Sequence, residues 1–161
     1  MSSAVTSLRR QGSAVALLGF GGIALLAISQ PIWLVGSLVI WAYCLYLLFY
    51  SLEENIRDGE SALLASLGWP TLVTLVRGVL LAVVAGFLII PVPLGVRAYF
   101  PAGAYTLAVL LDAVDGRLAR AMGRATRLGE RLDMEVDAAG ILIASLLAIQ
   151  YGKLPAWYVV I

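Results

Sequence analysis

Long apolar stretches constrain the fold of this chain more than any other feature of its sequence. Six of them follow one another, separated by short polar linkers, and they cover residues 13–29, 32–50, 71–92, 98–111, 138–150 and 154–161. A helix needs about 20 such residues to cross a membrane. Apolar residues make up 61% of the 161 residues and charged residues 13%, whereas soluble domains contain about 45–50% and about 25%. The sequence therefore predicts an all-α, polytopic membrane bundle with about five full transmembrane helices and the start of a sixth.

The charge balance and the absence of histidine exclude several classes of function. The net charge is +1, so no general attraction to nucleic acid is expected. Because the sequence has no histidine, histidine-ligated zinc, Ser-His-Asp triads and histidine proton shuttles are excluded. Cys44 is the only cysteine, which excludes an intrachain disulfide and a cysteine metal cluster. Any bound metal must therefore be held by oxygen, with five Asp and five Glu as the available carboxylates.

The first two apolar runs predict an N-terminal hairpin. Arg9 and Arg10 precede the first run, which is also the pattern of a secretory signal peptide. The second run begins almost at once, after Gln30 and Pro31, and this favours a retained pair of helices. We therefore expect residues 1–50 to form an extra transmembrane hairpin ahead of the rest of the bundle.

Residues 51–69 are expected to form a cytoplasmic linker whose two halves differ. The first half is polar, while the second half, residues 62–69, carries Leu63, Leu64 and Leu67 on roughly one helical face. This pattern predicts a short helix lying on the membrane surface. A plain solvated linker is the alternative that the same residues allow.

The fourth and fifth apolar runs, residues 98–111 and 138–150, are too short to span a membrane by themselves. Each spans only if its helix continues into the charged stretch between the two runs. The aspartates at these junctions are Asp112, Asp115, Asp133 and Asp137. Carboxylates at a membrane boundary are costly unless they face a bundle interior, a wet cavity or a metal.

The basic residues predict the orientation in the membrane. If the linkers alternate sides, one side receives Arg9, Arg10, Arg57, Arg117, Arg120, Arg124, Arg127 and Arg131. The other side receives only Arg97 and Lys153. Since basic residues collect on the cytoplasmic side, the N-terminus and residues 112–133 are expected there. We expect an integral protein of a bacterial or archaeal plasma membrane.

Four of the five aspartates fall between residues 112 and 137, on two helical faces. The first face carries Asp112, Asp115 and Ala119, with Gly116 beside them. The second face carries Gly129, Asp133 and Asp137. A short connection joins the helices, so they are expected to be antiparallel neighbours whose carboxylates face each other. Four carboxylates this close cannot all ionise without cations, and hard oxygen ligands favour Mg²⁺, Mn²⁺ or Ca²⁺.

The same residues form a specific pattern. From Asp112 to Asp137 the sequence reads D-x-x-D-G-x-x-A-R-x8-G-x3-D-x3-D. This pattern resembles the signature of the CDP-alcohol phosphotransferases, also called CDP-alcohol phosphatidyltransferases, at all its fixed positions. That family also has an Asn-x-x-Thr-x-x-Arg run on the preceding helix, which Thr74 and Arg77 match while Thr71 replaces the asparagine. The resemblance covers about residues 70–161, the expected catalytic core.

The resemblance implies a membrane enzyme of phospholipid synthesis. Such enzymes transfer a substituted phosphate from a CDP-linked alcohol to an acceptor hydroxyl and release CMP. CDP-diacylglycerol is the favoured donor, CDP-choline-type donors use the same motif, and the acceptor alcohol stays open. By position, two Mg²⁺ or Mn²⁺ ions would be ligated by Asp112, Asp115, Asp133 and Asp137, and Asp137 would also take the acceptor proton. The CDP moiety would lie against Thr74, Arg77, Gly116, Ala119, Arg120 and Gly129. A homodimer in contact with membrane lipids is also implied.

Two other functions stay open at this point. The family core usually has six helices counted from the one that bears Arg77, whereas this chain reaches Ile161 after about three. The core is therefore expected to be truncated at its C-terminus, and a catalytically incomplete fragment is one alternative. A cation-binding transport or structural protein is the other. It would place carboxylates deep within the membrane spans, whereas here they cluster at one edge.

Overall fold

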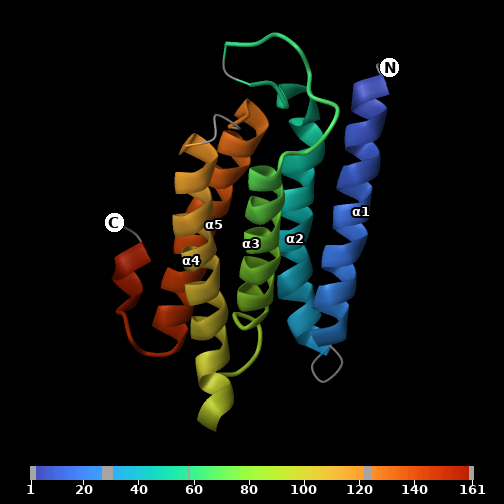
Figure 1. The fold of residues 1–161 in the computed structure, drawn as a ribbon. Helices are drawn as coiled ribbons and strands as arrows, with labels where there is room; N and C mark the ends of the chain where they lie inside the picture. Colours follow the sequence, from blue (N-terminus) through green and yellow to red (C-terminus); the bar gives the residue numbers. More distant parts are fainter. Residues whose placement is uncertain (1–2, 27–30, 58, 122–124, 160–161) are drawn as a thin grey trace.

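The described residues form five long helices, and each successive helix runs antiparallel to the one before it (Figure 1). The computed structural model describes residues 3–26, 31–57, 59–121 and 125–159, and for residues 114–121 it describes the backbone alone. The long helices are α1 (Ser3–Leu26), α2 (Pro31–Tyr50), α3 (Trp69–Gly86), α4 (Phe100–Ala121) and α5 (Arg127–Gln150). Three short 3₁₀ helices are η2 (Leu52–Glu54), η3 (Gly95–Tyr99) and η4 (Ala156–Val159). Among the described residues there is no strand, so the predicted all-α class is confirmed.

Helix α3 lies at the centre of the bundle and packs against each of the other four long helices. Its side chains are almost all apolar, which is typical of a helix that is buried on every side. Gly86 permits a close approach to α2, because an added Cβ would lie 2.4 Å from Nε1 of Trp33. Arg77 is the single charged residue of α3, and it is buried.

A cluster of buried leucines connects the first two helices with the start of α5. Its most deeply buried members are Leu8, Leu48, Leu75, Leu128 and Leu132, which come from α1, α2, α3 and α5. Each buried leucine contributes about 1.5–3 kcal/mol relative to an exposed one. The N-terminal hairpin is therefore packed onto the helix that carries two of the predicted metal ligands.

Helices α4 and α5 both continue through the charged stretch, as the sequence predicts. Helix α4 extends past Asp112, and α5 begins ahead of Asp133. The start of α5 is fixed by Thr126, whose Oγ1 accepts a hydrogen bond from the N–H of Gly129 at 3.1 Å. Such a cap satisfies one of the free N–H groups at a helix start.

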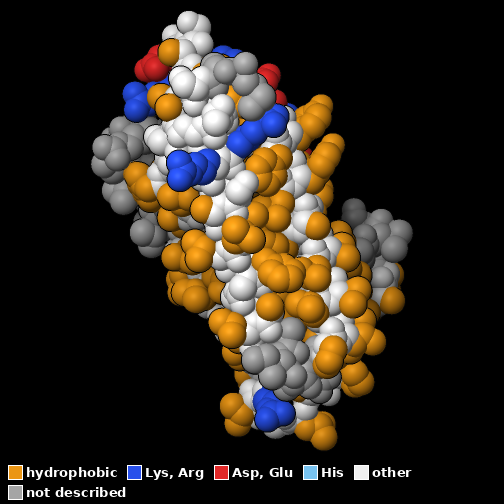
Figure 2. Space-filling model, turned by 90° about the vertical axis from the view of Figure 1, so that its right-hand side faces the viewer, with side chains coloured by type: hydrophobic (Ala, Val, Ile, Leu, Met, Phe, Trp, Pro, Cys, Tyr) orange, Lys and Arg blue, Asp and Glu red, His pale blue; other side chains and the backbone are white. Residues whose placement is uncertain are grey.

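Two of the described helices, α2 and α3, are long and apolar enough to cross a membrane. A buried helix of a soluble protein also meets this description, so these two helices alone do not establish the predicted number of crossings. Where the start of a sixth helix is predicted, the described residues form only η4. Figure 2 shows hydrophobic side chains over the middle of one face, with the acidic and most of the basic side chains near one end and a basic side chain at the other.

The surface helix predicted within residues 62–69 is wrong. The segment up to the start of α3 consists of bends and irregular chain. Hydrogen bonds to distant residues satisfy its backbone instead of a helical ladder. Asn55 donates from Nδ2 to the carbonyl oxygen of Leu64 at 3.2 Å, and the N–H of Leu67 donates to Oε1 of Gln11 at 3.0 Å. Leu67 is thereby buried in the leucine cluster rather than placed on an outer surface.

Candidate active site

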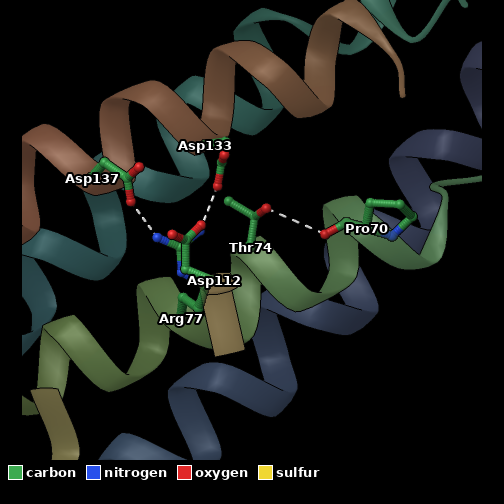
Figure 3. A network of polar contacts seen from close by, with 6 residues as sticks. All are labelled: Pro70, Thr74, Arg77, Asp112, Asp133 and Asp137. Atoms are coloured by element: carbon green, nitrogen blue, oxygen red, sulfur yellow. Dashed lines mark hydrogen bonds and ion pairs between the residues drawn. The ribbon is translucent and has the colours of Figure 1, made fainter. Parts of the chain in front are cut away.

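A cluster of charged side chains forms where α3, α4 and α5 meet. Helix α3 contributes Arg77, α4 contributes Asp112, and α5 contributes Asp133 and Asp137 (Figure 3). Nη1 of Arg77 lies 2.8 Å from Oδ1 of Asp112. Nη1 also donates to Oδ1 of Asp133, and Nη2 donates to Oδ1 of Asp137. One guanidinium therefore contacts three carboxylates from two helices.

Helix geometry accounts for this arrangement. Asp133 and Asp137 are four residues apart, so they project from the same face of α5. Because α4 and α5 are antiparallel (Figure 1), the second half of α4, with Asp112, lies at the same end of the bundle as the first half of α5. The sequence prediction that carboxylates of these two helices face each other is thus confirmed for three of the four aspartates.

Burial differs sharply between the cation and its partners. The side chain of Arg77 is 5% exposed, whereas the side chains of Asp112, Asp133 and Asp137 are 38%, 39% and 46% exposed. A guanidinium stays charged in a protein, and a buried charge must be paired. With all three carboxylates ionised, three negative charges and one positive charge leave these four residues with a charge of −2. The cluster is therefore open to solvent on its acidic side and short of positive charge.

The donor set fits a hard divalent cation. One oxygen atom from each of Asp112, Asp133 and Asp137 lies within 4.8 Å of the others. Carboxylate oxygens are the ligands that Mg²⁺, Mn²⁺ and Ca²⁺ prefer. Oδ1 of each carboxylate forms the ion pair with Arg77, and a carboxylate accepts bonds on both oxygens.

Two further predicted residues lie close to this cluster. Thr74 is one turn ahead of Arg77, is buried, and donates from Oγ1 to the carbonyl oxygen of Pro70 at 3.2 Å (Figure 3). Gly129 lies in the first turn of α5, where an added Cβ would be 3.2 Å from Oγ1 of Thr71. Glycine therefore permits α3 and α5 to approach closely here, and Thr71, which replaces the expected asparagine, takes part in that contact.

Four predicted site residues on α4 can be placed only along the backbone. Asp115, Gly116, Ala119 and Arg120 belong to the last turns of this helix, but their side chains lie outside the described residues. Their roles therefore stay predictions.

Residues ahead of the predicted core brace the start of α5, and the sequence analysis did not find these contacts. Nη1 of Arg131 donates to Oε1 of Glu54 in η2 at 2.7 Å. Tyr43 on α2 donates from its hydroxyl to Oε2 of Glu135 at 2.6 Å. The spacing of Arg131 and Glu135 at i, i+4 places them on a common face. That spacing was the only signal in the sequence, and it does not identify the partners.

A comparison with known protein families identifies the family of the chain. A family model described as CDP-alcohol phosphatidyltransferase matches residues 67–161, more than half of the chain, and this segment contains α3, α4 and α5. The chain belongs to the CDP-alcohol phosphatidyltransferase family. No curated protein and no solved structure matches the sequence. The resemblance drawn from the pattern between Asp112 and Asp137 is thereby confirmed.

Membership of the CDP-alcohol phosphatidyltransferase family sets the general chemistry. Its members are membrane proteins that transfer phosphate-containing groups from CDP-alcohols to alcohol acceptors in phospholipid synthesis. They generally depend on divalent metal ions. The acidic cluster around Arg77 lies within the matched segment and has the donor atoms that such an ion requires.

Proposed function

We propose that the protein is an integral-membrane phosphotransferase that moves a phosphatidyl-type group from a CDP-alcohol, with CDP-diacylglycerol favoured, to an acceptor hydroxyl. The convergence of Asp112, Asp133 and Asp137 on one buried arginine carries this proposal. In the reaction, the acceptor oxygen forms a bond to the β-phosphorus of the CDP-alcohol, the bond from that phosphorus to CMP breaks, and the acceptor loses its proton.

The proposed metal ligands are Asp112, Asp115, Asp133 and Asp137, which together would hold two Mg²⁺ or Mn²⁺ ions. Bound ions of this kind offset the charge of the diphosphate and make an acceptor hydroxyl more acidic. Asp137 is the most exposed of the three described carboxylates. Its side chain is thus the most accessible of the three to an incoming alcohol, which supports its proposed role as the group that accepts the acceptor proton.

The remaining residues of the site would bind the donor. We expect Arg77 and Arg120 to lie near the phosphates, since guanidinium groups pair well with phosphate oxygens. The pocket for the CDP moiety would be shaped by Thr74, Gly116, Ala119 and Gly129. The position of buried Thr74, one turn ahead of Arg77, is the described feature that supports its place in this assignment.

The proposed arrangement in the membrane has five crossings and the start of a sixth. Residues 1–50 would form the extra hairpin, residues 51–69 the cytoplasmic linker and residues 70–161 the core. The N-terminus and the carboxylates would face the cytoplasm, because most basic residues lie on that side of the predicted topology. A lipid-linked donor then keeps its tails in the bilayer while its nucleotide reaches the carboxylates. We include the homodimer implied by the family in this proposal.

The test is CMP release by the protein purified in detergent. It uses CDP-diacylglycerol, Mg²⁺ or Mn²⁺, and a panel that includes glycerol phosphate, inositol phosphate and serine. We expect the wild type to release CMP with one acceptor, Asp137→Asn to abolish release, and the matched control Glu130→Gln on the same helix to retain it. Equal rates for the two variants would contradict the proposed role of Asp137.

A separate binding measurement distinguishes the catalytically incomplete alternative. If the chain binds CDP-diacylglycerol and Mn²⁺ but releases no CMP with any acceptor, it has a donor site but does not catalyse the transfer. That result would favour the catalytically incomplete alternative. A chain that binds Mn²⁺ but no CDP-alcohol would instead favour a cation-binding transport or structural role.

A further inference from the structure

A cavity of about 580 Å³ lies at the end of the bundle away from the carboxylates, between α3, η3, α4 and α5. This volume is in the range of small-molecule and lipid pockets, which is about 300–1,000 Å³. Four small alanine side chains leave room for this cavity. Ala98 of η3 and Ala102 of α4 line one side, and Ala144 and Ala148 of α5 line the other. Because larger side chains at these positions would close the space, its size is a direct consequence of the sequence.

The cavity is apolar along its walls and polar in only a few places. Its lining includes Tyr99, Tyr105, Tyr151 and Lys153. The hydroxyl of Tyr151 is buried and has no hydrogen-bond partner among the described residues. Buried hydroxyl groups are normally hydrogen-bonded, so the hydroxyl of Tyr151 has an unused donor beside the cavity. Lys153 is exposed and forms no ion pair with any described residue.

This cavity is separate from the site that would bind the nucleotide. Ala148 follows Asp137 by eleven residues on α5, a distance of about 16 Å along the helix axis. Tyr105 precedes Asp112 by seven residues on α4, about 10 Å along the axis. A nucleotide held by the carboxylates therefore does not fill the cavity.

We propose that this cavity binds an anionic phospholipid from the membrane leaflet opposite the active site. Its acyl chain would lie against the alanines, and its phosphate would contact Lys153 and accept a hydrogen bond from Tyr151. The apolar walls match the acyl chain, and Lys153, the cation among the described lining residues, matches the charge of the head group. Basic residues are scarce on this predicted side of the membrane. Few other cations on this side therefore compete with Lys153 for the phosphate of an anionic lipid.

Native mass spectrometry of the delipidated full chain tests this proposal. The probes are phosphatidylglycerol and phosphatidylcholine with identical acyl chains, added to wild type, Lys153→Gln and Arg97→Gln. Arg97 is the matched control because it lies near the same end but lines a neighbouring pocket. We expect the wild type and Arg97→Gln to retain phosphatidylglycerol about tenfold better than phosphatidylcholine, because both lipids carry the same phosphate but the choline cation of phosphatidylcholine is repelled by Lys153. Lys153→Gln should bind both lipids alike.

A second variant tests the location of the acyl chain. Ala148→Phe would fill the cavity and should release both lipids, with circular dichroism confirming that the helices remain. Equal retention of the two lipids by the wild type, or equal losses in Lys153→Gln and Arg97→Gln, would overturn the proposal. The proposal would also be overturned if the protein is a dimer and Ala148→Phe dissociates it, since a second copy of the chain would then occupy the cavity. None of these measurements depends on CMP release, so they fail or succeed independently of the proposed enzyme activity.

Discussion

Replacing Arg77 by methionine should destabilise the protein and make its stability depend on divalent cations. The change keeps a long side chain in the buried position but removes the only described cation that contacts Asp112, Asp133 and Asp137. The carboxylate oxygens lie within 4.8 Å of one another. At that separation, two unit charges repel by about 3.5 kcal/mol at an effective dielectric constant of about 20.

Solvent reduces this repulsion, since the three carboxylates are 38%, 39% and 46% exposed. Removing one partner of a fully buried ion pair costs about 3–5 kcal/mol. We therefore expect Arg77→Met to lower the free energy of unfolding by about 2 kcal/mol. For a chain of this length, that corresponds to a decrease in Tm of about 4–8 °C.

Thermal unfolding followed by tryptophan fluorescence, with and without Mn²⁺, measures both effects. Because a divalent cation can replace the missing positive charge, Mn²⁺ should raise the Tm of Arg77→Met more than that of the wild type. Arg57→Met is the matched control, since Arg57 pairs with Glu60 at 3.7 Å in an exposed setting, and exposed pairs contribute at most about 1 kcal/mol. The reasoning is refuted if Arg77→Met unfolds at the wild-type temperature, or if Mn²⁺ stabilises both proteins equally.

Three substitutions test the packing around the site by thermal unfolding. Gly86→Ala should lower the free energy of unfolding by about 1–3 kcal/mol, because the new methyl group would lie 2.4 Å from the indole nitrogen of Trp33. Gly21→Ala is the control, since nothing lies within 4 Å of its added Cβ. Equal decreases in Tm for the two variants would contradict the close packing at Gly86. Thr126→Ala should cost about 0.5–2 kcal/mol through loss of the α5 cap, and an unchanged Tm would show that the cap is not formed. Tyr43→Phe removes the hydrogen bond to Glu135 and should lower the free energy of unfolding by about 0.5–1.5 kcal/mol. A double-mutant cycle with Glu135→Gln should give a coupling energy between the two residues, and the absence of coupling would contradict this hydrogen bond.

The local part of the site could be predicted from the sequence. The spacing between Asp112 and Asp137 determines which residues share a helical face, because the periodicity of a helix does not depend on its surroundings. The short connection between α4 and α5 also dictates that they are antiparallel. These two rules predict that carboxylates of α4 and α5 can face each other, and one oxygen each of Asp112, Asp133 and Asp137 lies within 4.8 Å of the others.

The tertiary contacts could not be predicted in the same way. Arg77 has a matching position in a family pattern, but its contact with three carboxylates depends on how α3 packs between two other helices. In the linker, the spacing of the leucines within residues 62–69 predicts a helix that the structure does not contain. The side chains of Asn55 and Gln11 bind its backbone groups instead, and local periodicity carries no information about such distant partners.

Dependence of CMP release on divalent cations is the most direct test of the account. The purified wild type, supplied with CDP-diacylglycerol and its acceptor, would be measured before chelation with EDTA, after it, and after Mn²⁺ is added back. Because the carboxylates around Arg77 are proposed as the metal ligands, release should stop in EDTA and return with Mn²⁺. Release at the full rate in EDTA would contradict the central claim.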